Sequence, residues 1–219
     1  MRKATKVTVS TFGAIAAMAG IEHGIGEILQ GNVAPNSIVI ESWPGSGLFR
    51  ILAGEPAMTI IPNLLVSGIL AILFSLVFLV WALLFVQRKN GGLVLILLSI
   101  VMLLVGAGFG PPLLGIILGV TATRINSPLT WWRAHLSHDT RRFLSRLWPW
   151  ALVAGFIAWL FVFPGSVLLD YFVGVANPER TIAPLIFSAF GLLLLSIATA
   201  FAHDLQQQTE AQQTLAMSR

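Results

Sequence analysis

The stretch GAGFGPP, residues 106–112, decides how a long apolar run of this chain is divided. The run extends from Gly91 to Thr123 and could otherwise form one tilted helix. Its two consecutive prolines lack amide donors, and a proline also disfavours helical geometry in the residue before it. The stretch therefore predicts a tight turn that joins two shorter apolar helices, at about residues 91–106 and 112–123.

The composition assigns the whole chain to a membrane. Of its 219 residues, 56% are hydrophobic and 10% are charged, whereas about 25% are charged in a soluble domain. The mean hydropathy is +0.85. We therefore expect an all-α, polytopic helical bundle in the cell membrane, with one transmembrane domain over residues 1–205 and a polar cytoplasmic tail over 206–219. The chain has no cysteine, which excludes disulfides and thiolate chemistry.

Apolar segments define the expected spans, and the first two are long enough to cross about 30 Å of hydrocarbon. They lie at about residues 7–29, 58–86, 91–106, 112–123, 150–173 and 182–203, with an outer loop at 30–57. The fifth span is expected to kink near Pro164. The first span has a basic start and the small residues Ala17 and Ala19 two positions apart, so it also resembles a cleaved secretory signal. Because hydroxyl residues dilute its apolar core, we expect it to be retained.

Positive charge distinguishes six spans from five. With a turn at 106–112, both termini lie on one side of the membrane with eleven of the thirteen Lys and Arg residues, and only Arg50 and Arg180 lie opposite. Without the turn, the division becomes six against seven. Because Lys and Arg concentrate in cytoplasmic loops, we expect six spans with both termini cytoplasmic. The net charge of +4 follows from this topology and does not indicate nucleic acid as a partner.

Residues 127–147, SPLTWWRAHLSHDTRRFLSRL, are expected to form an amphipathic helix on the cytoplasmic membrane surface. Ser127 is a suitable N-cap, and Pro128 suits the first helical position. Bulky apolar side chains then gather on one side and most charged ones on the other, where arginines can meet anionic head groups. A solvated loop helix with no partner other than lipid has the same pattern.

A candidate functional site lies in GIEHGIGE, residues 20–27, where the first span carries two glutamates and a histidine. Ionisable groups in membrane spans are costly and often mark binding sites or transport pathways. His23 and Glu27 are about 40° apart around a helix, so they can share a ligand or a proton. Glu27 continues a stripe of small residues that favours close helix packing. Glu22 lies about 140° from Glu27, nearly opposite the stripe, and is retained as a candidate ligand-binding residue.

Depth along the helices places further polar residues in the same outer layer. Asn63 near the start of the second span and Asp170 near the end of the fifth are both expected close to the outer boundary. Glu55 belongs to the outer loop above them. The expected ligand-binding residues are His23, Glu27, Asn63, Asp170, Glu22 and Glu55. A structural role is the alternative, because near the boundary such groups reach water and can hydrogen-bond helices together.

Three functions fit these features. The preferred one is binding or translocation of a small polar or cationic solute in a pocket that opens outward. The second is a membrane enzyme that uses His23 and Glu27 as acid and base on a lipid-like or quinone-like substrate. A metal is an open cofactor for it, since one histidine with carboxylates suits Zn, Mn or Fe but no metal-binding motif is present. The third is a non-catalytic scaffold that forms a homo-oligomer or binds another membrane protein through GIILG, residues 115–119.

Overall fold

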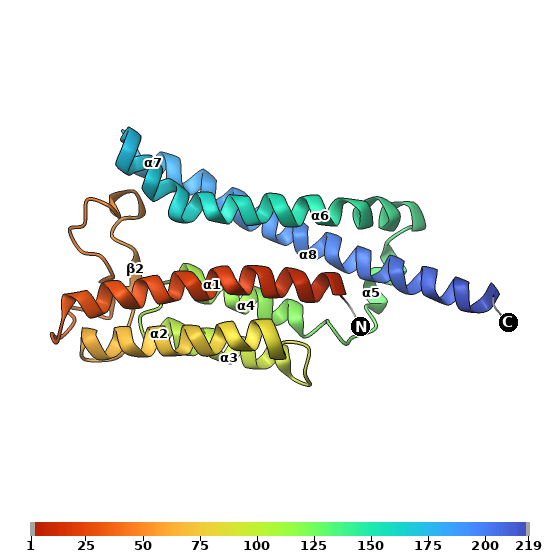
Figure 1. Ribbon diagram of the computed structural model, residues 1–219, viewed down its shortest axis with the longest axis horizontal. Coiled ribbons are helices and arrows are strands. Elements are labelled where there is room, and N and C mark those ends of the chain that lie inside the picture. The colour runs from red at the N-terminus through yellow and green to blue at the C-terminus, as the bar shows by residue number, and fades with distance from the viewer. Residues whose placement is uncertain (1–2, 218–219) are drawn as a thin grey trace.

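The computed structural model describes residues 3–217, and its helices form two groups that lie side by side (Figure 1). The first group contains α1 (Lys3–Gln30), α2 (Leu64–Val80), α3 (Gly91–Leu104) and α4 (Gly110–Ala122). The second is a helical hairpin of α6 (His138–Leu160), α7 (Ser166–Val173) and α8 (Pro178–Met217), preceded by α5 (Thr130–His135). Two π-helical segments, η2 (Trp81–Phe85) and η3 (Phe161–Gly165), follow α2 and α6.

The segment between α1 and α2, which the sequence predicts to be the outer loop, contains the two strands of the described chain. They are β1 (Val39–Glu41) and β2 (Pro56–Met58), with the 3-10 helix η1 (Arg50–Leu52) between them. The strands pair in antiparallel register, with Ile40 opposite Ala57. An isolated bridge between Thr59 and Val105 then attaches the loop to the end of α3.

Four helices are long and apolar enough to cross a membrane: Lys3–Gln30, Leu64–Phe85, His138–Val173 and Arg180–Gln212. Helices α3 and α4 are apolar but shorter, with 14 and 13 residues. Large apolar side chains cover the outer faces, as for Leu73 and Leu97, which are 51% and 62% exposed. The expected all-helical architecture is confirmed, and these helices indicate a membrane protein.

The break expected at residues 106–112 is present between α3 and α4. The backbone turns through Gly106 (φ +95°) and Gly108 (φ +78°), both in the left-handed region that glycine adopts without strain. The two prolines lie just after the turn, in the first turn of α4. Amides in the first turn of a helix have no partner within the helix, so proline, which lacks an amide hydrogen, is tolerated there. Helix α4 therefore begins at Gly110, slightly before the expected start at about residue 112.

Helices α1 and α2 pack with their backbones almost in contact. A Cβ placed on Gly24 of α1 would lie 2.7 Å from the carbonyl oxygen of Gly68 of α2. On the same face, a Cβ on Gly20 would lie 2.9 Å from the methyl carbon of Met102. The small-residue stripe of the first helix is therefore the surface on which α2 packs and which the side chain of Met102 reaches from α3.

The amphipathic helix expected over residues 127–147 is not continuous. Helix α5 ends at His135, the next residue is extended, and Ser137 caps a new helix by accepting a hydrogen bond from the amide of Thr140. This helix is α6, so its residues 138–147 extend a spanning helix and do not form a separate surface helix. The polar segment after residue 206 likewise continues α8 as far as Met217.

The kink expected near Pro164 separates α6 from α7. Phe163 has an extended backbone (φ −152°, ψ 128°), and the Phe163–Pro164 peptide bond is cis. Proline also removes an amide donor from the helix at this point. The kink places Phe163 in the wall of a cavity that is described below.

One buried carboxylate joins the two helix groups. Asp204 of α8 is 2% exposed and accepts hydrogen bonds from the amides of Ala4 (3.0 Å) and Thr5 (2.9 Å) and from the Thr5 hydroxyl (2.6 Å). These amides begin α1, where donors lack partners within the helix and the helix dipole favours negative charge. Figure 1 shows α8 close to α1 at this end and farther from it at the other.

Candidate functional site

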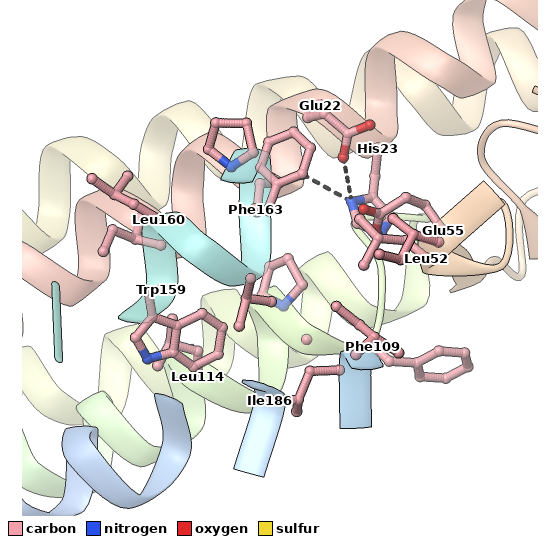
Figure 2. A pocket seen from close by; sticks show the side chains of 18 of the residues that line it. Glu22, His23, Leu52, Glu55, Phe109, Leu114, Trp159, Leu160, Phe163 and Ile186 are labelled. Atoms are coloured by element: carbon pink, nitrogen blue, oxygen red, sulfur yellow. Dashed lines mark hydrogen bonds and ion pairs between the residues drawn. The ribbon is translucent and has the colours of Figure 1, made fainter. Parts of the chain in front are cut away.

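A cavity of about 900 Å³ lies between the two helix groups, beside the outer loop. Its walls come from α1, α4, η1, α6, η3 and α8. They are mainly apolar and aromatic, and Figure 2 shows among them Phe109, Leu114, Trp159, Leu160, Phe163 and Ile186. Small-molecule sites have volumes of about 300–1,000 Å³ and a similar lining, so the cavity is of the right size and character to hold a ligand.

One end of the cavity is polar and contains Glu22, His23 and Glu55 (Figure 2). The His23 side chain is only 4% exposed. Its Nδ1 lies 2.9 Å from the carbonyl oxygen of Ala19 and 3.1 Å from Oε2 of Glu22. Its Nε2 lies 3.0 Å from Oε2 of Glu55. The indole of Trp43 donates a hydrogen bond to the other oxygen of Glu22, so the outer loop supplies partners to both residues of α1.

The contacts of Nδ1 determine which ring nitrogen carries the hydrogen. A carbonyl oxygen can only accept, so Nδ1 donates to Ala19. Oε2 of Glu22 is buried and has no hydrogen-bond donor among the described residues, so the Nδ1 hydrogen is directed at Ala19 and not at Glu22. Nε2 and the carboxylate of Glu55 would then be two acceptors facing each other. A proton or a cation between them is required to remove the repulsion.

The turn between α3 and α4 closes over the imidazole ring. A Cβ on Gly108 would lie 2.7 Å from both Cδ2 and Cε1 of His23. Gly108 is therefore required for this contact as well as for its positive φ. The sequence places the turn and the histidine separately, and the structure shows that one covers the other.

Glu27 lies one helical turn from His23 but does not line the cavity. It is 0% exposed, and within the described part of the chain neither carboxylate oxygen has a hydrogen-bond partner. A Cβ on Gly106 would overlap its carboxyl group. The pair predicted from the sequence therefore separates, because His23 faces the cavity and Glu27 faces the packed turn.

Asn63 and Asp170 both contact the loop between α1 and α2, and each is used by local structure. Asn63 caps α2 by accepting a hydrogen bond from the amide of Val66 (3.0 Å), and it donates one to Asn32. Asp170 pairs with Arg50 of η1 and accepts from the amide of Val175 (2.9 Å). These contacts hold the outer loop against α2 and α7. The structure thus brings together three of the six predicted residues, Glu22, His23 and Glu55.

Sequence reasoning missed the aromatic wall of the cavity. Four of its residues, Phe156, Trp159, Leu160 and Phe163, follow the i, i+3, i+4, i+7 spacing of one helix face. That signal is hidden in a membrane helix, because the lipid-facing side is equally apolar.

No known protein family, curated protein sequence or solved structure shows a significant match to this chain. Its function is therefore inferred from the cavity and its polar end.

Proposed function

We propose that this chain is a membrane protein that binds an amphiphilic small molecule in the cavity between its two helix groups. The observation that carries the proposal is a cavity with apolar, aromatic walls and one acidic end, formed by Glu22, His23 and Glu55. The walls suit an aliphatic or aromatic body. Two carboxylates around one imidazole suit a polar end that is cationic or donates hydrogen bonds.

The apolar walls narrow the ligand class that was expected from the sequence. A small polar solute would contact only the acidic end and would leave the apolar walls without a packing partner. An amphiphile contacts both parts of the cavity. The rim supports entry from the bilayer, because it includes Met18, Phe109 and Leu160, which are 64%, 40% and 39% exposed. In a membrane such side chains contact acyl chains, so we propose that the ligand enters laterally between the two groups.

The binding test uses a fluorescent long-chain amine and a matched long-chain alcohol with the protein in detergent. Ala14 lines the cavity, and we expect Ala14→Phe to weaken amine binding at least tenfold, about 1.4 kcal/mol, by occupying its volume. The control is Ala154→Phe on the exposed face of α6, which should bind as wild type does. Equal affinity of the wild type and Ala14→Phe would overturn the proposal. Glu55→Gln should weaken binding of the amine more than that of the alcohol.

An enzyme is the second candidate function, and the contact between His23 and Glu55 favours it. An imidazole paired with a carboxylate at the end of a ligand cavity can transfer a proton to or from a bound molecule. The partner in this version is Glu55 and not Glu27, since Glu27 does not reach the cavity. Chemical conversion of the bound amphiphile, followed by mass spectrometry, distinguishes the enzyme from a binding protein.

A scaffold receives less support, because the GIILG segment is already used within the bundle. A Cβ on Gly115 would lie 3.0 Å from the ring of Phe78, and one on Gly119 would lie 2.6 Å from Ile96. These glycines let α4 pack against its neighbours α2 and α3. They do not leave a small-residue face free for another membrane protein.

We also propose that both termini are cytoplasmic and that six helices enter the bilayer. Helices α3 and α4, each about 20 Å long, would form a hairpin that enters and leaves on the cytoplasmic side, shorter than the ~30 Å core. Figure 1 supports this, since both termini and α5 lie at one end of the molecule. The charged residues expected at that end and described by the structure are Lys3, Lys6, Arg88, Lys89, Arg124, Arg133, Arg141, Arg142 and Arg146. Arg2 and Arg219 lie outside the described residues.

Topology is testable with single cysteines, since the chain has none of its own. In intact cells, a membrane-impermeant maleimide should label Ser37→Cys in the outer loop and should label Lys89→Cys only after permeabilisation. The reverse pattern would refute cytoplasmic termini.

A further inference from the structure

We propose that Glu22, His23 and Glu55 form a binding site for one divalent transition-metal ion at the polar end of the cavity. One ligand atom from each residue lies within 4.8 Å of the other two. The inference goes beyond the proposed function, because the ion would compete with a cationic head group for the acidic end and would leave the apolar part of the cavity free.

The hydrogen bond from Nδ1 to Ala19 prepares His23 as a metal ligand. Metal-binding histidines usually donate their other ring N–H to a carbonyl or carboxylate, which fixes the tautomer and the ring orientation. Here the backbone carbonyl of Ala19 is 2.9 Å from Nδ1. The lone pair is therefore on Nε2, which points away from α1 and toward Glu55.

The spacing of the three side chains is close to that of a metal centre. Ligand atoms bonded at about 2.1 Å in tetrahedral geometry lie about 3.4 Å apart. Nε2 of His23 and Oε2 of Glu55 are 3.0 Å apart. Oε2 of Glu22 is 3.1 Å from Nδ1, at the other edge of the ring, so this carboxylate would have to rotate toward Nε2 to bind the same ion. Trp43 holds the remaining oxygen of Glu22.

Charge balance favours a dication at this position. Two carboxylates and a neutral imidazole carry two negative charges, and the His23 and Glu22 side chains are only 4% and 15% exposed. A single proton on Nε2 would leave one negative charge uncompensated, whereas a divalent ion neutralises both. Uncompensated charge in a low-dielectric interior is strongly unfavourable.

The ligand set defines the class of metal. One imidazole and two carboxylates suit Zn²⁺, Mn²⁺ or Fe²⁺, and the absence of cysteine from the chain disfavours soft ions such as Cu⁺. Three protein ligands leave at least one coordination position, and because the three residues line the cavity, a molecule in the cavity can reach that position. Water or an uncharged or anionic polar group of a bound molecule would complete the coordination.

The test uses the full chain in detergent, stripped with a chelator and titrated with Co²⁺ while visible absorption is recorded. Wild type should bind one equivalent, and His23→Gln and Glu55→Gln should each weaken binding at least about tenfold. The matched control is His138→Gln, since His138 is exposed and its Nδ1 lies 3.8 Å from Asp139. It should bind Co²⁺ as wild type does. Loss in His138→Gln with retention in the other two variants would show adventitious surface binding and overturn the proposal.

A second readout needs no variant. Pulsed EPR of Mn²⁺ bound to wild type should show coupling to one imidazole nitrogen, and binding without such coupling contradicts ligation by His23. Failure of the metal site is distinguishable from failure of the proposed function, because the amine titration is repeated in the presence of the chelator. Amine binding without Co²⁺ binding would refute only the metal site.

Discussion

Gly106→Ala is expected to lower the free energy of unfolding by about 3 kcal/mol, from about 1–2 kcal/mol of left-handed backbone strain and about 1–3 kcal/mol of overpacking. The backbone of Gly106 has φ +95°, and a Cβ there would lie 2.6 Å from Cδ of Glu27. The turn would have to move away from α1, and the lid that Gly108 forms over His23 would move with it. Unfolding in mixed micelles, followed by tryptophan fluorescence, measures the change.

The control for this variant is Gly191→Ala in α8. A Cβ at Gly191 meets no described atom within 4 Å, and alanine favours a helix over glycine by about 1 kcal/mol. We expect no loss of stability for this variant. Adding Glu27→Ala to Gly106→Ala should restore the steric part of the loss but not the backbone strain. If the two glycine variants have the same stability, the turn does not pack on Glu27.

Asp204→Ala should destabilise the protein by about 3–4 kcal/mol, because hydrogen bonds to a charged group contribute about 1.5–3 kcal/mol each and are not fully additive. Three donors at the start of α1 lose their acceptor in this variant. The hairpin of α6 and α8 would lose its anchor to α1, so binding in the cavity should weaken as well. Unfolding in mixed micelles and the amine titration measure the two effects.

Two variants show whether Asp204 acts through these donors. Thr5→Val removes only the hydroxyl contact at 2.6 Å and should cost about 1 kcal/mol. Asp139→Ala removes a fully exposed carboxylate from the start of α6, and surface changes of this kind usually stay within about 0.5 kcal/mol. An Asp204→Ala protein as stable as Asp139→Ala would disprove the anchor.

The helices could be predicted from the sequence because apolar length and proline position are local signals. The turn at 106–112 and the kink at Pro164 both follow from proline and glycine chemistry. The sequence predicted a helix start at Ser127, but the structure does not begin a helix there. Tertiary packing overrides the local capping signal of this residue. Ile125 and Leu129 are buried in the core, and Leu129 adopts φ +48°, which is incompatible with a helix that runs on from Ser127. The first helix therefore begins at Thr130 and ends at His135, and Ser137 caps the next one, α6.

The site could be predicted only in part. The position of His23 on α1 follows from helix periodicity, but the role of Glu22 does not, because an angle around the axis ignores how far a long side chain reaches. Depth along the helices predicted Asn63 and Asp170 at the same level as the loop, but only the loop conformation shows that Asn63 bonds to Asn32 and that Asp170 pairs with Arg50. The cavity itself depends on the separation of two helix groups, for which no local sequence signal exists.

Photoaffinity labelling in lipid nanodiscs tests the central claim most directly. A long-chain amine that carries a diazirine in its apolar chain is photolysed with the protein, and the modified residues are mapped by mass spectrometry. We predict modification within residues 109–114, at the start of α4, and 156–163, in α6 and η3, because both ranges line the cavity. Unlabelled amine should compete with this modification. Modification confined to lipid-facing positions such as Leu73 and Leu84 on α2 and η2, without competition, would contradict a ligand cavity between the two helix groups.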